Sequence, residues 1–182
     1  MIGVLVSGRG SNLQALIDQQ LPIAGVASNV TGAGALERAG RAGIPTGVFE
    51  LDDYASREER DLAMSEWLAG LGVELVVCAG YMQLLTPRFI ERFPCLNVHP
   101  SLLPAFPGLD AVGQALAAAA EETGVTVHFL DEGVDTGPVI AQERVVIAPG
   151  DTAETLYARI REIEHRLLPE AVRLYLAGAI RS

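Results

Sequence analysis

The chain has 182 residues, 49% of them hydrophobic, and 13 basic against 23 acidic side chains give a formal net charge of −10. A chain of this length can bury one core without disulfides or metal ions, and its acidic balance excludes a general nucleic-acid binder, which needs a basic surface. All of the basic side chains are arginines, so Schiff-base chemistry and a P-loop lysine are excluded.

The cysteines and the apolar runs indicate the compartment. Cys78 and Cys95 lie in apolar stretches and form no C-x-x-C pair, which predicts buried thiols in a reducing compartment. No apolar run approaches the ~18 residues of a membrane span, and the first residues lack the cationic segment of a signal peptide. We therefore expect one cytoplasmic domain over residues 1–182 without a membrane partner, as a monomer or homodimer.

Short apolar runs rich in β-branched residues alternate with helical patterns along the chain. We expect strands over residues 2–6, 23–27, 47–49, 75–79, 96–98, 125–129 and 139–147, and helices over 12–17, 35–42, 58–71, 88–93 and 111–121. This alternation predicts the α/β class, with a Rossmann-like, mostly parallel twisted sheet and helices on both of its faces.

The last helix is expected to begin at Asp151 or Thr152, with Asp151 and Glu154 as a capping pair. Apolar residues then recur every three or four positions and predict a buried stripe of Leu156, Ile160, Ile163, Leu167, Ala171 and Leu174. Pro169 interrupts this stripe, and we expect it to kink or divide the helix because proline cannot donate a backbone hydrogen bond.

A glycine-containing loop, Ser-Gly-Arg-Gly-Ser-Asn over residues 7–12, follows the first strand and opens the first helix. Backbone N–H groups in this setting can hold a phosphate. A dinucleotide fingerprint would need a third glycine where Leu13 stands, and the second strand ends in Ser28-Asn29 instead of an acidic residue, so NAD binding is disfavoured. A phosphomonoester site and a plain turn capped by Ser11 both remain open.

Two polar residues share one face of a short buried strand, because Asn97 and His99 are two positions apart. They lie at the carboxyl end of the strand, where open α/β sheets form clefts, and a stiff loop with Pro100 and Pro104 follows them. An amide and an imidazole side by side can stabilise the oxyanion of an acyl transfer, and a histidine can exchange a proton near neutral pH. The alternative is a structural histidine that is bonded to a backbone carbonyl.

Asp135 lies in Gly-Val-Asp-Thr-Gly-Pro, residues 133–138, after another strand. Its carboxylate could orient His99 and stabilise the protonated imidazole, or it could form an ordinary Asx turn, and spacing alone does not decide. The acidic residues beside it lack the calcium-loop pattern, and the cysteines and histidines lack zinc spacing. We therefore expect no metal.

Together these motifs resemble the folate-dependent phosphoribosylglycinamide formyltransferases of purine synthesis. The resemblance extends from residues 4–12 through Asn-Val-His-Pro-Ser-Leu-Leu-Pro (97–104) and residues 133–138 to Glu164-His165, which is nearly the whole chain. The central segment is shared with methionyl-tRNA formyltransferases and formyltetrahydrofolate hydrolases. Those enzymes typically carry further domains, for which we expect no room here, and the glycine loop resembles the glycinamide-ribotide phosphate site.

The resemblance implies a role for each matching position. The ribotide phosphate would be held by Gly10, Ser11 and Asn12, with Arg161 adding charge and Glu164 contacting the ribose. Counted along a helix, the last two lie on the flank of the apolar stripe, and the alternative is a solvated flank.

The resemblance also implies a folate site. The pterin would lie against Met82, Gln83, Leu84 and Leu85 and against the loop Leu130, Asp131, Glu132, Gly133 and Val134, near Asn97, while Arg57 would meet the carboxylate tail. The alternatives are that Met82, Leu84 and Leu85 are ordinary core and that Arg57 is a surface residue. The chain departs from the family pattern at Ala105, Asp110 and Gly113, where basic residues are common.

The reaction that the resemblance implies is transfer of a formyl group from 10-formyltetrahydrofolate, as co-substrate, to the amine of glycinamide ribonucleotide. Asn97 and His99 would stabilise the oxyanion, His99 would protonate the departing folate nitrogen, and Asp135 would keep His99 protonated. The alternatives are a formyltetrahydrofolate hydrolase and a non-catalytic module that binds a phosphorylated metabolite.

Overall fold

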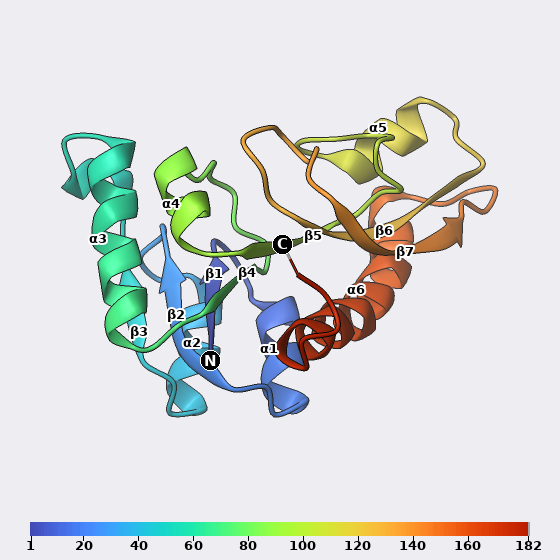
Figure 1. Ribbon diagram of the computed structural model, residues 1–182. Helices are drawn as coiled ribbons and strands as arrows, with labels where there is room; N and C mark the ends of the chain where they lie inside the picture. Colours follow the sequence, from blue (N-terminus) through green and yellow to red (C-terminus); the bar gives the residue numbers. More distant parts are fainter. Residues whose placement is uncertain (182) are drawn as a thin grey trace. The chain divides into compact units, whose positions relative to one another are not determined.

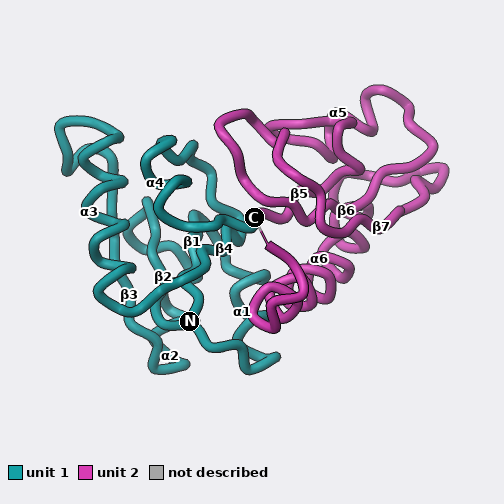
Figure 2. Tube along the Cα trace, in the orientation of Figure 1, with its two compact units in different colours: residues 1–96 teal, residues 97–182 magenta. Residues whose placement is uncertain are grey.

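The computed structural model describes residues 1–181 and divides the chain into two compact units, residues 1–96 (unit 1) and 97–182 (unit 2), which Figure 2 colours separately. Its seven strands form one sheet in the order β3-β2-β1-β4-β5-β6-β7. The expected α/β fold with a mostly parallel sheet is confirmed. The boundary between the units falls within β5, the strand that carries Asn97 and His99.

Nearly every expected element is present within a few residues of its expected ends (Figure 1). The strands are β1 (Ile2–Val6), β2 (Ile23–Ser28), β3 (Thr46–Val48), β4 (Leu75–Cys78), β5 (Cys95–His99), β6 (Glu122–Phe129) and β7 (Val139–Val146). The helices are α1 (Ser11–Asp18), α2 (Gly34–Arg41), α3 (Arg57–Gly70), α4 (Pro87–Arg92), α5 (Ala111–Ala117) and α6 (Ala153–Leu176), with a short 3-10 turn η1 (Leu51–Asp53).

Unit 1 is a parallel α/β layer built around β1. This strand pairs in parallel with β2 and β4, and β2 pairs in parallel with β3. All five residues of β1 are buried, so both faces of the strand are covered, as expected for a strand that is apolar throughout. Cys78 and Cys95 are buried free thiols, as predicted, and burial raises the pKa of Cys78 to about 12.

Unit 2 contains an antiparallel pair, in which β6 and β7 run from Glu122 opposite Val146 to His128 opposite Val139. Helix α6 packs against both strands. An exposed ion pair joins the helix to β7, because Arg166 reaches both carboxylate oxygens of Glu143 at 2.6 Å. None of the helices within residues 1–181 has the length and apolarity to cross a membrane.

Helix α5 is shorter than expected, since it ends at Ala117 and not at residue 121. Ala119 adopts a positive φ of 49°, and the chain then enters β6 at Glu122. Alanine has a high helix propensity, so the run of alanines suggested a longer helix. Pairing of residues 122 and 123 with β7 decides otherwise.

The start of α6 lies at Thr152, one of the two expected positions, but the capping residues differ from the expectation. Thr152 is the N-cap and forms a capping box with Thr155, so the expected pair of Asp151 and Glu154 is wrong. Asp151 instead accepts a hydrogen bond from Ala148 N at 2.7 Å, which holds the preceding turn. Pro169 does not divide the helix, which continues unbroken to Leu176 with the proline ring buried.

The predicted buried stripe of α6 is confirmed at Leu156, Ile160, Leu167 and Ala171. Ile163 is only half-buried and Leu174 is 39% exposed, whereas Glu164, Leu168 and Val172 are buried as well. The width of the buried face is set by the surfaces that the helix packs against, so apolar spacing alone did not define it. Glu164 therefore lies within the buried face and not on a solvated flank.

Candidate active site

Strand β5 brings the side chains of Asn97 and His99 to one polar cluster in unit 2. His99 is 5% exposed, and Asn97 is half-buried. The two residues alternate with the buried Leu96 and Val98, so the apolar residues take the opposite face of the strand. This arrangement is the one that the spacing of the two polar residues predicted.

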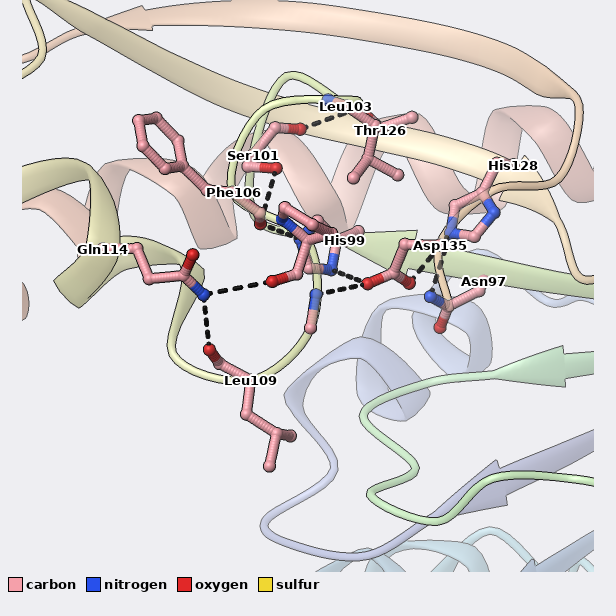
Figure 3. Close-up of polar contacts among 12 residues, drawn as sticks. Asn97, His99, Ser101, Leu103, Phe106, Leu109, Gln114, Thr126, His128 and Asp135 are labelled. Atoms are coloured by element: carbon pink, nitrogen blue, oxygen red, sulfur yellow. Dashed lines mark hydrogen bonds and ion pairs between the residues drawn. The ribbon is translucent and has the colours of Figure 1, made fainter. Parts of the chain in front are cut away.

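The loop between β6 and β7 adds Asp135 to this cluster, as Figure 3 shows. Its Oδ2 lies 3.4 Å from His99 Nδ1, and its Oδ1 lies 3.5 Å from His128 Nε2. The backbone N–H of Gly108 donates to Oδ2 at 2.7 Å. The carboxylate thus turns toward the two imidazoles and the Gly108 amide, and the structure brings the three expected catalytic residues together.

The surroundings of Asp135 favour its charged form. Burial by itself would raise the pKa of this carboxyl group. Hydrogen bonds from His128 and from the Gly108 amide, together with the charges of His99 and His128, outweigh burial and hold the pKa below its ordinary value of 3.8. Asp135 is therefore a carboxylate at neutral pH.

The contacts of His99 identify the nitrogen that can exchange a proton. Nε2 lies 2.8 Å from the carbonyl oxygen of Phe106, which can only accept, so Nε2 carries a hydrogen. Nδ1 therefore gains or loses the proton, and it faces the carboxylate of Asp135. Its distance of 3.4 Å exceeds that of a good N–H···O bond, roughly 2.7–3.2 Å, so Nδ1 can take a further partner.

His128 belongs to the cluster although sequence reasoning did not include it. Its Nδ1 donates to the Phe129 carbonyl oxygen at 2.8 Å, and its Nε2 lies 3.1 Å from Asn97 Nδ2 and 3.5 Å from Asp135 Oδ1. His128 thus positions the Asn97 amide beside the carboxylate. The available signal was polar Thr126 and His128 at alternate positions of a strand that is buried from Thr123 to Phe129.

The glycine loop of unit 1 takes the shape that its glycines permit. Gly10 has a φ of 76°, and a Cβ there would lie 2.5 Å from Ala35 Cβ, so any other residue would clash. Gly10 is the N-cap of α1, and no side chain among the described residues caps this helix. Its first N–H groups are thus not taken by a capping side chain, which removes Ser11 as the N-cap and fits an anion site.

Ser7 links the ends of three strands in unit 1, a role that sequence reasoning missed. Its hydroxyl donates to Asn29 Oδ1 after β2 and accepts from Met82 N, after β4, at 2.8 Å. Its own N–H donates to Gly80 O at 3.1 Å. The glycine loop and the expected pterin segment are therefore connected through one side chain.

The segment expected to contact the pterin lies at the surface. Met82 is 62% exposed and Leu84 is 57% exposed, so the alternative that they are ordinary core is wrong. Leu85 is half-buried, and Arg57, the first residue of α3, is exposed. Large apolar side chains left in solvent fit a surface that an aromatic ligand covers.

Behind this segment lies a buried ion pair of unit 1. Arg60 and Asp61 have side chains that are 0% and 1% exposed, and Nε and one terminal nitrogen of the guanidinium donate to Oδ1 of Asp61 at 2.9 and 2.6 Å. The other carboxylate oxygen accepts from Thr86 N at 2.7 Å. Arg60 also reaches Gln83 Oε1 at 3.4 Å. Gln83 and Arg60 line a hollow of about 400 Å³.

In unit 2, the loop from Leu130 to Val134 is closed by one of its own residues. Asp131 Oδ1 accepts from Gly133 N at 3.0 Å and from Thr136 Oγ1 at 2.7 Å, so Asp131 shapes the loop. Glu132 and Gly133 are exposed, Leu130 is half-buried and Val134 is 50% exposed.

The two residues of α6 expected near the ribotide differ in exposure. Glu164 is buried, and Arg161 is half-buried with its guanidinium 5.1 Å from the ring centre of Tyr157. Within residues 1–181, no group of three or more histidine, cysteine or acidic side chains could hold a metal ion.

Comparison with known proteins identifies the family. Residues 1–172 match the model of the formyl transferase family. The chain is 43% identical to the phosphoribosylglycinamide formyltransferase of Haemophilus influenzae, over 99% of this chain and 89% of that one. It is 46% identical, over 99% of its length, to the trifunctional purine biosynthetic protein adenosine-3 of Drosophila pseudoobscura pseudoobscura, of which it spans 14%.

The fold is similar to that of solved relatives as well. A crystal structure of glycinamide ribonucleotide transformylase 1 from Symbiobacterium toebii matches with a TM-score of 0.94 and 48% identity, over 97% of this chain and 87% of that one. The chain therefore belongs to the formyl transferase family, and within it to the phosphoribosylglycinamide formyltransferases.

Proposed function

We propose that this chain transfers the formyl group of 10-formyltetrahydrofolate to the amine of glycinamide ribonucleotide in purine synthesis. Family membership supports this reaction, and the single observation that carries it is the cluster in which His99, Asp135 and Asn97 meet. In this reaction the amine nitrogen attacks the formyl carbon, the bond from that carbon to the folate nitrogen breaks, and a proton passes from the amine to the folate nitrogen.

Each residue of the cluster has a distinct task in this proposal. The Asn97 amide and the Nδ1 hydrogen of His99 stabilise the oxygen that becomes negative in the tetrahedral intermediate. His99 Nδ1 then gives its proton to the departing nitrogen and recovers one from the attacking amine. The carboxylate of Asp135 stabilises the imidazolium, since its lowered pKa keeps it charged.

Backbone N–H groups and arginines bind the two anionic substrates in this proposal. Gly10, Ser11 and Asn12 hold the ribotide phosphate at the start of α1, where a helix N-terminus favours negative charge. Arg161 and Glu164 contribute to binding of the same substrate. With a net charge of −10 and no lysine, the protein attracts these ligands only locally, through backbone N–H groups and guanidinium groups.

The folate co-substrate contacts two segments and one arginine in this proposal. The exposed apolar side chains of Met82 and Leu84 support a pterin-binding role for the segment that also contains Gln83 and Leu85. The loop Leu130–Val134 gives a second surface, and Arg57 contacts the carboxylate tail. We further propose that residues 1–182 act as one cytoplasmic formyltransferase domain.

An absorbance assay of folate deformylation, with and without glycinamide ribonucleotide, tests the reaction. A transferase consumes 10-formyltetrahydrofolate only when the ribotide is present. A hydrolase consumes it without the ribotide, and a binding module does not consume it at all. Either of the last two results would overturn the proposal.

A further inference from the structure

One short turn, residues 106–109, contacts both titratable partners of the proposed reaction. The carbonyl oxygen of Phe106 accepts from His99 Nε2 at 2.8 Å, and the N–H of Gly108 donates to Asp135 Oδ2 at 2.7 Å. The first contact fixes which nitrogen of His99 carries the permanent hydrogen, and the second orients the carboxylate. The geometry of the site therefore depends on the geometry of this turn.

The turn has little regular structure or apolar packing to hold it. Leu109 is 76% exposed and Pro107 is exposed. Phe106 and Gly108 both adopt left-handed φ angles, 53° and 77°. Such a segment needs specific hydrogen bonds to keep one conformation, because a non-glycine residue at positive φ costs free energy.

Ser101 Oγ donates to Phe106 O at 3.3 Å, and two further hydrogen bonds come from Gln114 of α5 (Figure 3). Gln114 Nε2 donates to Pro107 O at 3.1 Å and to Leu109 O at 2.8 Å. The two carbonyl groups belong to the residues immediately before and after Gly108. One carboxamide thus holds the carbonyl of the peptide group that contains the Gly108 N–H, together with the carbonyl of Leu109 two residues further on.

We propose that Gln114 is a positioning residue, which holds this turn so that Phe106 O and Gly108 N stay aligned on His99 and Asp135. The inference rests on the proposed function, since the aligned residues are those of the formyl-transfer reaction. Among the described residues, no hydrogen bond joins Gln114 to His99 or to Asp135. Its effect passes through the backbone of the turn. Loss of its hydrogen bonds should therefore lower kcat and speed hydrogen exchange of the Gly108 amide, and leave substrate binding nearly unchanged.

Gln114→Met tests the proposal because methionine keeps the length of the side chain and removes both donors. We expect kcat to fall by about 10- to 100-fold, the scale of a small misplacement of catalytic groups, with both KM values within about twofold. Hydrogen exchange of the Gly108 amide, followed by NMR, should become about tenfold faster or more. Gln114→Glu, which also lacks the donating NH2 group, should give the same two changes.

Gln142→Met is a matched control. Gln142 Nε2 also donates two hydrogen bonds, to Leu103 O and Thr126 Oγ1, each at 2.8 Å, and it supports a different part of the same loop. We expect Gln142→Met to lose about as much thermal stability as Gln114→Met. The hydrogen-exchange rate of the Gly108 amide should be unchanged, and kcat should be nearly unchanged.

Unchanged Gly108 exchange in folded Gln114→Met and Gln114→Glu, or equal changes in Gln142→Met, would overturn the proposal. Because hydrogen exchange needs no substrate, it tests this inference even if the wild-type chain transfers no formyl group. That second result would contradict only the proposed function.

Discussion

Two aspartates of this molecule, one in each unit, pair with nitrogen bases in opposite ways. Asp61 lies fully buried with Arg60 at 2.6 Å, and its second oxygen is bonded to a backbone amide. Asp135 is 11% exposed and meets two histidines at 3.4 and 3.5 Å. Arginine does not lose its proton in a protein, whereas histidine does near neutral pH.

The kind of base and the contact distance decide whether a buried carboxylate forms a structural ion pair or assists proton transfer. The Arg60–Asp61 pair is permanent and fully bonded, so it can fix the segment after β4 but cannot move a proton. The cluster around Asp135 has longer contacts and a partner, His99, with one exchangeable nitrogen. Three experiments distinguish the two pairs.

Removal of the His99 imidazole or the Asp135 carboxylate should have the largest effect on activity. His99→Ala and Asp135→Asn should each lower the rate of formyl transfer by roughly 10²- to 10⁴-fold, because each removes a donor or the group that orients it. Steady-state kinetics with both substrates measures this effect, and circular dichroism checks that the variants fold. Near wild-type turnover in either folded variant would remove these residues from the mechanism.

Breaking the permanent pair should instead lower stability. Arg60→Met leaves Asp61 buried with its charge uncompensated, and we expect the free energy of unfolding to fall by about 3–5 kcal/mol. Urea denaturation at neutral pH measures this change. Arg166→Met is the matched control, since its pair with Glu143 is exposed to solvent and should contribute far less to stability. Equal losses in the two variants would show that burial does not distinguish these pairs.

The smallest effect concerns acid stability. The pKa of Asp135 lies below 3.8 in the folded protein, so its carboxylate adds stability that is complete above the unfolded value and is lost as pH falls through the lower folded value. Asp135→Asn should remove this part of the acid dependence. Urea unfolding of wild type and variant across the acidic pH range measures this dependence. If the free energy of unfolding changes with pH equally in both, Asp135 does not carry the assigned charge.

The sequence predicted those features that depend on local pattern. The strands 2–6 and 75–78 could be read from apolar runs, and the turn at Gly10 from its glycines. That Asn97 and His99 share a face follows from the two-residue period of a strand. In each case the deciding interactions lie within a few residues of the chain.

Other features depend on contacts between distant residues, which spacing does not encode. Glu164 is buried in the packed face of α6 although apolar spacing placed it on a flank, and α5 ends at Ala117 because residue 122 pairs with β7. Arg60 and Asp61 are consecutive residues of α3, which seldom face one another on a helix, yet they form a buried ion pair.

Local patterns and motifs in the sequence were sufficient to predict the fold class, the family and the candidate groups Asn97, His99 and Asp135. The contacts of Asp135 with His99, of His128 with Asn97 and of Gln114 with the turn 106–109 became visible only in the folded chain. Hydrogen bonds act over about 3 Å, so they depend on how loops from separate elements meet, whereas periodicity reports only what one element buries.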